Sequence, residues 1–397
     1  VILAHAQLFV QAGYPVTVVA GQGAAEALPE GVHLVLVPEI DSLHAEITRV
    51  GAQLEQGQVP PEFEAMSERL GSALAPILSS FDNLIVHNVF TKHFNLPLTV
   101  ALDRLLDGDR APHCIAVCHD FTWTSPSSGS KVHPGHPWDL LRTRRPGVTY
   151  VVVSLRRQLE LAGLFGCPAE EIHVVYNGVD PLTLLGLSAE GAALVERLGL
   201  LERDLVLLMP VRVTQAKNIE YALRLVAALK ARGIRPRLVL TGPPDPHDAE
   251  SMAYFRSLQA LRRELGVEEE MRFVFESGNQ PDEPYIIDAS VVGDLYRVSD
   301  LMFMPSHREG FAMPVLEAGL AGIPVVSTRV PAAVEIGGED VILFDLDESP
   351  DRLAARILAW AEGSAVHRLR RRVRQSYTWQ AIFRRDIEPL LRSREDA

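Results

Sequence analysis

Two glutamates around a glycine-bearing loop form the stretch of the sequence best suited to chemistry. Glu309 and Glu317 lie in residues 306–324, after an apolar run and on either side of Pro314, which suits the first turn of a helix. Free amides at that helix start, with the helix dipole behind them, would seat a diphosphate, and Glu317, one turn inside, would accept hydrogen bonds from a ribose diol. Taken alone, two such glutamates are ordinary surface residues. The amides concerned are those of Gly310, Phe311, Ala312 and Met313.

A basic pair follows another apolar run. Arg212 and Lys217 come after the predicted strand Leu205–Val211, and ligands bind at the carboxyl ends of strands in open α/β sheets. A planar guanidinium and an ammonium group together would neutralise a diphosphate leaving group. Basic residues after strands are common, so this pair is suggestive only in combination with the other motifs.

Polar residues end two apolar runs in the first half of the chain. His119 and Asp120 follow one run, and His87 and Asn88 end another. A lone histidine is usually structural, but two such strand ends in one sheet favour a cleft at that edge. We therefore treat His87, Asn88 and Asp120 as candidates for a cleft or acceptor site beside His119.

The elements that position these residues alternate between short β-branched runs and longer amphipathic stretches, which predicts an α/β fold with parallel sheets. The first half predicts strands at Val16–Ala20, Val32–Val37, Asn83–His87, Cys114–Cys118, Thr149–Val153 and His173–Tyr176. The second half predicts strands at Leu205–Val211, Arg237–Thr241, Arg272–Phe275, Leu301–Met304, Pro324–Thr328 and Val341–Phe344. Both halves read as Rossmann-like doubly wound domains, joined near residues 177–180. Residues 122–145, rich in Pro, Ser, Gly and His, predict a long loop.

The first residues predict a helix ending at Gly13, followed directly by a strand. A doubly wound domain normally opens with a strand and a glycine-rich loop. We therefore expect the first strand and its loop to belong to a segment upstream of residue 1.

Composition narrows the class of protein. With 397 residues, two domains are the default, and 47% hydrophobic residues supply ample core. A net charge of −13 argues against a general nucleic-acid binder. Three cysteines give no disulfide framework, and Cys114 and Cys118 lie in an apolar run that predicts buried packing. With neither a membrane span nor a leader apparent, we expect a cytoplasmic protein.

Two clusters of arginines stand out against the acidic total. We interpret them as solvated helix faces, the alternative being a dock for an anionic lipid or acceptor, with peripheral contact to the inner face of the membrane. The clusters are Arg142, Arg144, Arg145, Arg156 and Arg157, and Arg368, Arg370, Arg371, Arg372 and Arg374.

Taken together, these motifs resemble the family-4 (group 1) retaining glycosyltransferases with the GT-B architecture. The strongest likeness is Glu309 through Glu317, two glutamates separated by seven residues. Arg212 and Lys217 resemble the family's basic pair, His119-Asp120 its His-Asp, and residues 376–379 the start of its final helix.

The resemblance implies two facing domains with a cleft between them: residues 1–180 bind the acceptor, 181–375 bind the nucleotide sugar, and 376–397 form a helix crossing back onto the first domain. It implies a hexosyltransferase in carbohydrate biosynthesis that needs no metal and no cofactor. Arg212, Lys217 and the loop amides would hold the diphosphate, Glu317 the ribose, and Glu309 the donor sugar. His119 would position that sugar and stabilise the positive charge developing at its anomeric carbon. The departing phosphate would then take the proton of the acceptor hydroxyl, which attacks on the same face.

Three segments depart from the pattern or invite another interpretation. Ala312 stands where the family commonly has glycine, which predicts that this position avoids a positive φ. Residues 277–284 predict a loop longer than is usual in the family. Asp345-Leu346-Asp347 has the spacing of a metal motif, but we interpret it as a turn and helix cap after a strand.

Two other functions remain open at this point. A nucleotide-sugar epimerase or hydrolase would use the same diphosphate pocket, and a non-catalytic sugar-nucleotide-binding protein would keep only the binding residues. UDP and GDP sugars both suit the predicted donor site. The acceptor is a sugar, a lipid-linked sugar or a polysaccharide, and the oligomeric state is undetermined.

Overall fold

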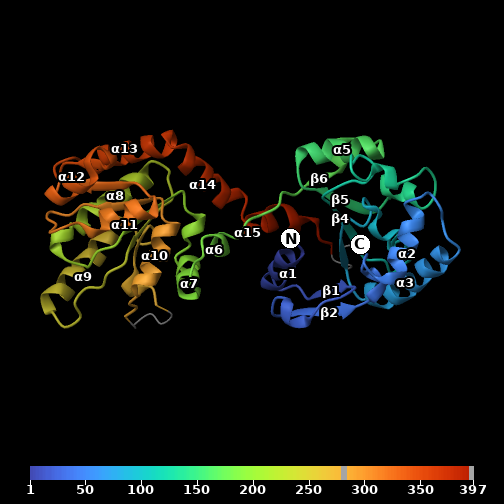
Figure 1. Cartoon of the computed structure of the whole chain (residues 1–397). Helices are drawn as coiled ribbons and strands as arrows, with labels where there is room; N and C mark the ends of the chain where they lie inside the picture. The colour runs from blue at the N-terminus through green and yellow to red at the C-terminus, as the bar shows by residue number, and fades with distance from the viewer. Residues whose placement is uncertain (279–283, 393–397) are drawn as a thin grey trace. The chain divides into compact units, whose positions relative to one another are not determined.

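The short apolar runs form parallel sheets in the computed structural model, which describes residues 1–278 and 284–392 (Figure 1). The chain divides into two units: unit 1 comprises Val1–Gly178 and Trp379–Ala397, and unit 2 comprises Val179–Thr378. Two segments lie outside the described residues. One is 279–283, in the loop predicted at residues 277–284, and the other is 393–397, in the predicted final helix. Val179 pairs with Thr378 in an isolated parallel bridge, so the chain enters and leaves unit 2 at neighbouring points.

Unit 2 contains a six-stranded sheet in the order β12-β11-β10-β7-β8-β9, with every pairing parallel. Its strands are β7 (Leu205–Met209), β8 (Pro236–Leu240), β9 (Met271–Phe273), β10 (Leu301–Met304), β11 (Val325–Thr328) and β12 (Ile342–Phe344). Numbered within the unit, this is the 3-2-1-4-5-6 order of a doubly wound domain. The order reverses between β7 and β10, and ligands bind at such a switch point.

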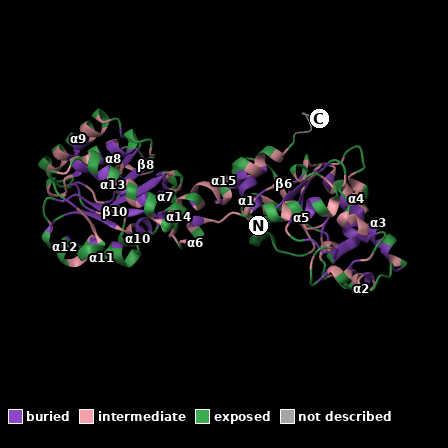
Figure 2. Cartoon of the chain, turned by 90° about the horizontal axis from the view of Figure 1, so that it is seen from above, coloured by how far each residue is buried: buried purple, intermediate pink, exposed green. Residues whose placement is uncertain are grey.

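Both faces of this sheet are covered by helices. The central strands β7, β8 and β10 are buried at every position, which is why they read as continuous apolar runs (Figure 2). Alternate residues of β7 enter two separate cores, one with α8, α9 and α13 and the other with α7, α10, α11 and α12. These helices are α7 (Ala189–Arg197), α8 (Ile219–Ala231), α9 (Ala249–Glu264), α10 (Ala289–Val298), α11 (Met313–Ala321), α12 (Pro331–Gly337) and α13 (Pro350–Gly363). A short helix, α6 (Pro181–Leu184), precedes them.

Unit 1 contains a four-stranded parallel sheet and a separate parallel pair. The sheet runs β3 (Asn83–His87), β4 (His113–Cys118), β5 (Val148–Val152) and β6 (His173–Val174), and the pair joins β1 (Val16–Ala20) to β2 (Val32–Leu36). Its helices are α1 (Ile2–Gln11), α2 (Ala45–Leu54), α3 (Glu62–Leu78), α4 (Leu96–Leu105) and α5 (Leu155–Phe165). The twelve predicted strands are thus all present, with bounds that differ by at most two residues. Residues 122–145 contain only two short 3₁₀ helices, Gly129–Lys131 and Trp138–Arg142.

The C-terminal segment packs onto unit 1, as the fold prediction requires. After α15 (Trp379–Ile382) the chain continues as a π-helical turn, Phe383–Ile387. Its side chains Ile382 and Phe383 share a core with α1 and with one face of β4 and β5. The opposite face of the sheet carries Cys114 and Cys118, which are buried as predicted, and burial raises the pKa of both thiols to about 12.

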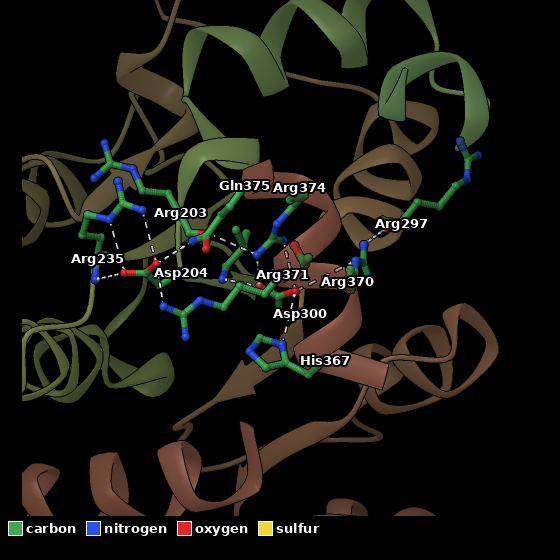
Figure 3. Close-up of polar contacts among 12 residues, drawn as sticks. Arg203, Asp204, Arg235, Arg297, Asp300, His367, Arg370, Arg371, Arg374 and Gln375 are labelled. Carbon is green, nitrogen blue, oxygen red and sulfur yellow. Dashed lines mark hydrogen bonds and ion pairs between the residues drawn. The ribbon is translucent and has the colours of Figure 1, made fainter. Parts of the chain in front are cut away.

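Helix α14 (Ala365–Ser376) is fixed to unit 2 by two aspartates that precede the central strands (Figure 3). Asp300, whose side chain is fully buried before β10, accepts hydrogen bonds from Arg374 at 3.1 and 2.9 Å. Asp204, before β7, accepts one from Arg371 at 3.0 Å. The interpretation of this arginine cluster as a solvated face is therefore wrong for Arg374, which is 6% exposed.

These contacts change the titration of both aspartates. Burial alone would raise their pKa values. For Asp204, hydrogen bonds from Arg235 and Gln375 and the charge of Arg371 outweigh burial and lower the pKa to about 2. For Asp300, His367 and Arg374 likewise bring the pKa below its ordinary value. Both carboxylates are therefore ionised at neutral pH.

No helix among the described residues is both long and apolar enough to cross a bilayer.

Candidate functional site

The loops after β7 and β10 meet at the switch point of unit 2. The amide of His307 donates to the carbonyl oxygen of Ala216 at 2.9 Å, which ties the loop after β10 to the loop after β7. Thr328 at the end of β11 donates its hydroxyl to the carbonyl oxygen of Ser306 at 2.6 Å. These bonds join the carboxyl ends of three neighbouring strands, so the candidate residues on these loops are held close to one another.

Lys217 and Glu309 form the centre of this edge. The Lys217 Nζ lies 2.7 and 2.8 Å from the two carboxylate oxygens of Glu309, and the Ser306 hydroxyl donates to Glu309 Oε1 at 2.5 Å. The Glu309 side chain is 9% exposed and that of Lys217 22%. A carboxylate so shielded and so fully hydrogen-bonded has one orientation, which suits it to contact a bound ligand rather than to move with solvent.

The helix start predicted as a diphosphate seat is α11. It begins at Met313 with Pro314 in its first turn, as expected, and no side chain caps its N-terminus. The amides there are therefore available to an anion, and the helix dipole favours one.

The expectation for Ala312 is wrong. This residue has φ +58°, in the left-handed region. Its methyl group is 3% exposed and belongs to the core under α11, so packing holds a conformation that costs an alanine about 1–2 kcal/mol. The loop keeps the geometry that a glycine would adopt without strain.

Glu317 is held by a residue that sequence reasoning missed. The Tyr296 hydroxyl, on α10, donates to Glu317 Oε2 at 2.7 Å. Burial and the hydrogen bond to this carboxylate raise the pKa of Tyr296, which stays protonated. Glu317 itself is exposed, so one carboxylate oxygen is anchored while the side chain still faces solvent.

Arg212 is exposed, and among the described residues the structure gives its side chain no ion pair. Its backbone is placed by Gly242, which follows β8. A Cβ on Gly242 would lie 2.5 Å from the carbonyl oxygen of Val211 and 2.8 Å from the Arg212 Cα and N atoms. The close approach requires glycine, and no motif in the sequence pointed to it.

The unit 1 candidates lie together at the ends of β3 and β4. The rings of His87 and His119 stack with centroids 5.9 Å apart, and His5 of α1 lies 5.6 Å from His87. Asn88, with φ +62°, accepts the amide of His119 on its side chain at 2.8 Å. Asn88 thus ties one strand end to the other and fixes the backbone at His119.

Burial keeps these imidazoles neutral. It lowers the pKa of His87 to about 3, and the positive charge that His5 or His119 would carry if protonated adds to the effect. Burial also lowers the pKa of His119, which Asp120 opposes. Neutral rings can donate or accept a hydrogen bond without adding charge.

Asp120 does not join this histidine group. Its carboxylate pairs with Arg157 of α5 at 2.7 Å. In unit 2, Asp345 pairs with Arg329 at 3.2 Å, and the cap of α13 is Ser349, so Asp345-Leu346-Asp347 is a turn but not the predicted helix cap. Within residues 1–278 and 284–392, no group of three or more His, Cys, Asp or Glu side chains is arranged to hold a metal ion.

Tyr296 and Gly242 in unit 2, and His5 in unit 1, each contact a candidate residue of their own unit without having been predicted. Each lies far along the chain from that residue, so sequence spacing carries no signal for it. Ser306 is only three residues from Glu309 and bonds it through its hydroxyl, so its position just before Glu309 was the available signal.

Residues 193–377 match the family model described as glycosyl transferases group 1. The chain is 26% identical over 245 residues to an uncharacterized glycosyltransferase of Methanocaldococcus jannaschii, and 31% identical over 254 residues to the D-inositol 3-phosphate glycosyltransferase of Saccharomonospora viridis. Each match covers 60% of this chain, but only 58% and 56% of the respective relative, so the chain spans little more than half their lengths. The solved structure of Anabaena HepE in complex with UDP is similar over 95% of this chain and 99% of that chain, with 16% identity and a TM-score of 0.37.

The family match includes the basic pair after β7 and both glutamates around the start of α11. Residues 193–377 are therefore similar in sequence to the group 1 glycosyl transferases.

Proposed function

We propose that the chain is a retaining glycosyltransferase that moves a hexosyl group from a nucleotide-diphosphate sugar to an acceptor hydroxyl. The observation that carries this proposal is the arrangement at the switch point of unit 2. There Lys217 and the shielded carboxylate of Glu309 lie beside an uncapped helix start within the matched domain. Such a site offers positive charge and free amides to a diphosphate and a fixed carboxylate to the sugar attached to it.

We assign a role to each candidate residue of unit 2, supported by its contacts. Arg212, Lys217 and the amides of residues 310–313 bind the diphosphate. Glu317, oriented by Tyr296, accepts hydrogen bonds from the ribose diol with its second oxygen. Glu309 contacts the donor sugar. Its carboxylate accepts two hydrogen bonds from Lys217, so a diphosphate that binds Lys217 competes with Glu309 for that ammonium group.

Unit 1 binds the acceptor in this proposal. His119, with its backbone fixed by Asn88 and its ring stacked on His87, positions the donor sugar and stabilises positive charge at the anomeric carbon. His87 and Asn88 line the acceptor side beside it, and Asp120, although paired with Arg157, remains a candidate for the same side.

In the reaction, the bond from the anomeric carbon to the diphosphate oxygen breaks while the acceptor oxygen bonds to the same face of that carbon. The departing diphosphate, neutralised by Arg212 and Lys217, takes the proton of the acceptor hydroxyl. The protein contributes position and electrostatic stabilisation of the leaving group. The proposed reaction requires no metal, and both UDP and GDP sugars fit the chemistry of the donor site.

The first test is a thermal-shift series with EDTA and with UDP, GDP, ADP and their sugar conjugates. A nucleotide that binds the folded chain raises its melting temperature by linkage. One nucleotide standing out in EDTA supports a metal-independent donor site and names the base.

The second test is Glu309→Gln, which keeps the shape of the side chain and removes its charge. We expect sugar transfer to fall by at least about 100-fold, as for other electrostatic groups in active sites, with nucleotide binding retained. The matched control is Glu339→Gln, an exposed glutamate of the same domain, which leaves transfer unchanged. The anomeric configuration of the product, read by NMR, reports retention. Normal transfer by Glu309→Gln refutes its role, and free sugar or an isomer formed without an acceptor refutes the transferase assignment.

A further inference from the structure

Helix α14 carries five arginines among its twelve residues, although the chain as a whole has a net charge of −13. Arg374 and Arg370 face the buried carboxylate of Asp300 (Figure 3). Arg371 faces Asp204. These contacts account for three of the five arginines and fix the helix beside the amino ends of β7 and β10.

The other two arginines, Arg368 and Arg372, lie about one turn apart on the solvent side of α14, and both are exposed. Arg368 donates to the backbone carbonyl oxygen of Glu362, in the last turn of α13. Among the residues that the structure describes, neither guanidinium has a carboxylate within ion-pair distance. Two positive charges therefore face solvent on a helix whose acidic neighbours are already taken by other arginines.

Exposed apolar side chains lie beside these charges. Val366 is 78% exposed and Leu369 is 59% exposed. Residues three or four apart lie on one side of a helix, so Leu369 is a neighbour of both Val366 and Arg372. The opposite side of α14 carries the buried residues His367 and Arg374. One exposed leucine is ordinary on a protein surface, but here two apolar side chains share a helix face with two uncommitted arginines.

We infer that this face of α14, formed by Val366, Arg368, Leu369 and Arg372, docks on an anionic membrane surface. A cluster of basic residues on an amphipathic helix attracts anionic lipids. Such a helix lies in the plane of the headgroups, with its guanidinium groups on lipid phosphates and its apolar side chains at the edge of the acyl region. The charges are complementary at this face, whereas the negative charge carried by the rest of the chain would be repelled.

The apolar side chains favour a membrane over a nucleic acid. Nucleic-acid phosphates would neutralise Arg368 and Arg372 but would leave Val366 and Leu369 in water. A bilayer accommodates both kinds of side chain, because the charged groups stay among the headgroups while the apolar ones leave water.

Docking through α14 leaves the donor candidates free. The helix is fixed to aspartates that precede β7 and β10, whereas Arg212, Lys217 and Glu309 follow those strands. The membrane face and the candidate donor site therefore lie at opposite edges of one parallel sheet. The inference rests on charge and exposure at α14 and does not depend on the proposed function.

Flotation of the full chain with vesicles of defined composition tests the inference. We expect binding to phosphatidylcholine vesicles that contain phosphatidylglycerol, no binding to phosphatidylcholine alone, and weaker binding at high salt. Arg368→Gln combined with Arg372→Gln should weaken this binding about 20-fold, since each arginine near an anionic surface contributes about fivefold. The matched control is Arg224→Gln with Arg263→Gln, which removes two exposed arginines from α8 and α9 and should change binding by less than about twofold.

Val366→Ser combined with Leu369→Ser separates insertion from attraction of charge. We expect binding to fall on the order of tenfold while its dependence on salt is kept. Because all four side chains are exposed, both α14 variants should keep the melting temperature of the unsubstituted chain. Equal binding by the α14 variants and the control overturns the inference, as does equal binding to the two kinds of vesicle or no binding to either. Loss in the arginine variant alone, with the serine variant unaffected, shows a polyanion site without membrane insertion and overturns it as well.

Discussion

Arg374→Met is predicted to destabilise unit 2 strongly, because it removes one half of a buried ion pair (Figure 3). The Arg374 side chain is 4% exposed and that of Asp300 is 0% exposed. Arg374 supplies two hydrogen bonds to Asp300 and a third, at 3.1 Å, to the carbonyl oxygen of Arg203. Methionine has similar length and no charge, so the substitution preserves most of the packing.

The size of the expected loss of stability follows from the contacts that Asp300 keeps when Arg374 is replaced. Asp300 keeps the hydrogen bond from the Val206 amide at 2.8 Å, but its second oxygen is left with His367 Nδ1 at 3.6 Å and Arg370 Nε at 3.9 Å, both too far for a hydrogen bond. Removing one partner of such a pair costs about 3–5 kcal/mol. The double variant Arg374→Met with Asp300→Leu removes both charges of the buried pair and therefore recovers part of that loss. About 1–3 kcal/mol of stability stays lost, because the Val206 amide no longer has a hydrogen-bond acceptor.

Native-state hydrogen exchange of the full chain measures this effect. Peptides covering β7 and β10 report the free energy of opening of unit 2 separately from that of unit 1. The matched control is Arg368→Met on the same helix, whose hydrogen bond goes to the carbonyl oxygen of Glu362 in the last turn of α13; it should change that free energy by less than about 0.5 kcal/mol. A loss below about 1 kcal/mol for Arg374→Met, or a double variant less stable than the single one, would refute the assigned desolvation penalty.

Three further predictions concern unit 2. Gly242→Ala should weaken nucleotide-diphosphate binding in calorimetry, since its Cβ would displace the backbone of Arg212. The control Gly293→Ala, whose Cβ meets nothing within 4 Å, should leave binding unchanged and stabilise by up to about 1 kcal/mol; equal binding by both variants contradicts the positioning role. Arg212→Ala combined with Lys217→Ala should reduce that affinity by about 3–5 kcal/mol, the sum of two charge-assisted contacts, and unchanged affinity excludes them as the phosphate clamp. Because the pKa of Asp204 is lowered from 3.8 to about 2, it stabilises the fold above pH 3.8 and that contribution is lost as the pH falls toward 2. As the pH is lowered through that window, the free energy of unfolding of Asp204→Asn should fall by about 1–2 kcal/mol less than that of the unsubstituted chain, allowing for solvent screening. Parallel acid-titration curves for the two proteins would refute the assignment.

Local pattern was sufficient for the strands and for the edge at which candidate residues gather. Fully buried parallel strands must be apolar at every position, so β7, β8 and β10 were visible as continuous runs. The residue that follows such a run lies at the ligand edge whatever the rest of the fold does. This is why Arg212, Lys217 and Glu309 could be selected from the sequence.

Conformation at single residues was less predictable. The left-handed backbone at Ala312 was not expected, because alanine by itself disfavours it. Burial of its methyl group among the side chains under α11 outweighs that local preference. Tertiary packing overrules propensity wherever the packing free energy exceeds about 1–2 kcal/mol.

The burial and the partners of charged side chains were the features that the sequence alone determined least. The sequence by itself determined the alternation of strands and helices, the two doubly wound halves and the strand ends that carry the candidate residues, since these depend on the periodicity of neighbouring side chains. Only the tertiary structure decided that Arg374 is buried against Asp300, that Tyr296 holds Glu317, and that Arg368 and Arg372 are exposed on the same helix as Arg374. The physical reason is that the free energy of a charge depends on its burial and its partners, and those partners come from segments distant in the chain.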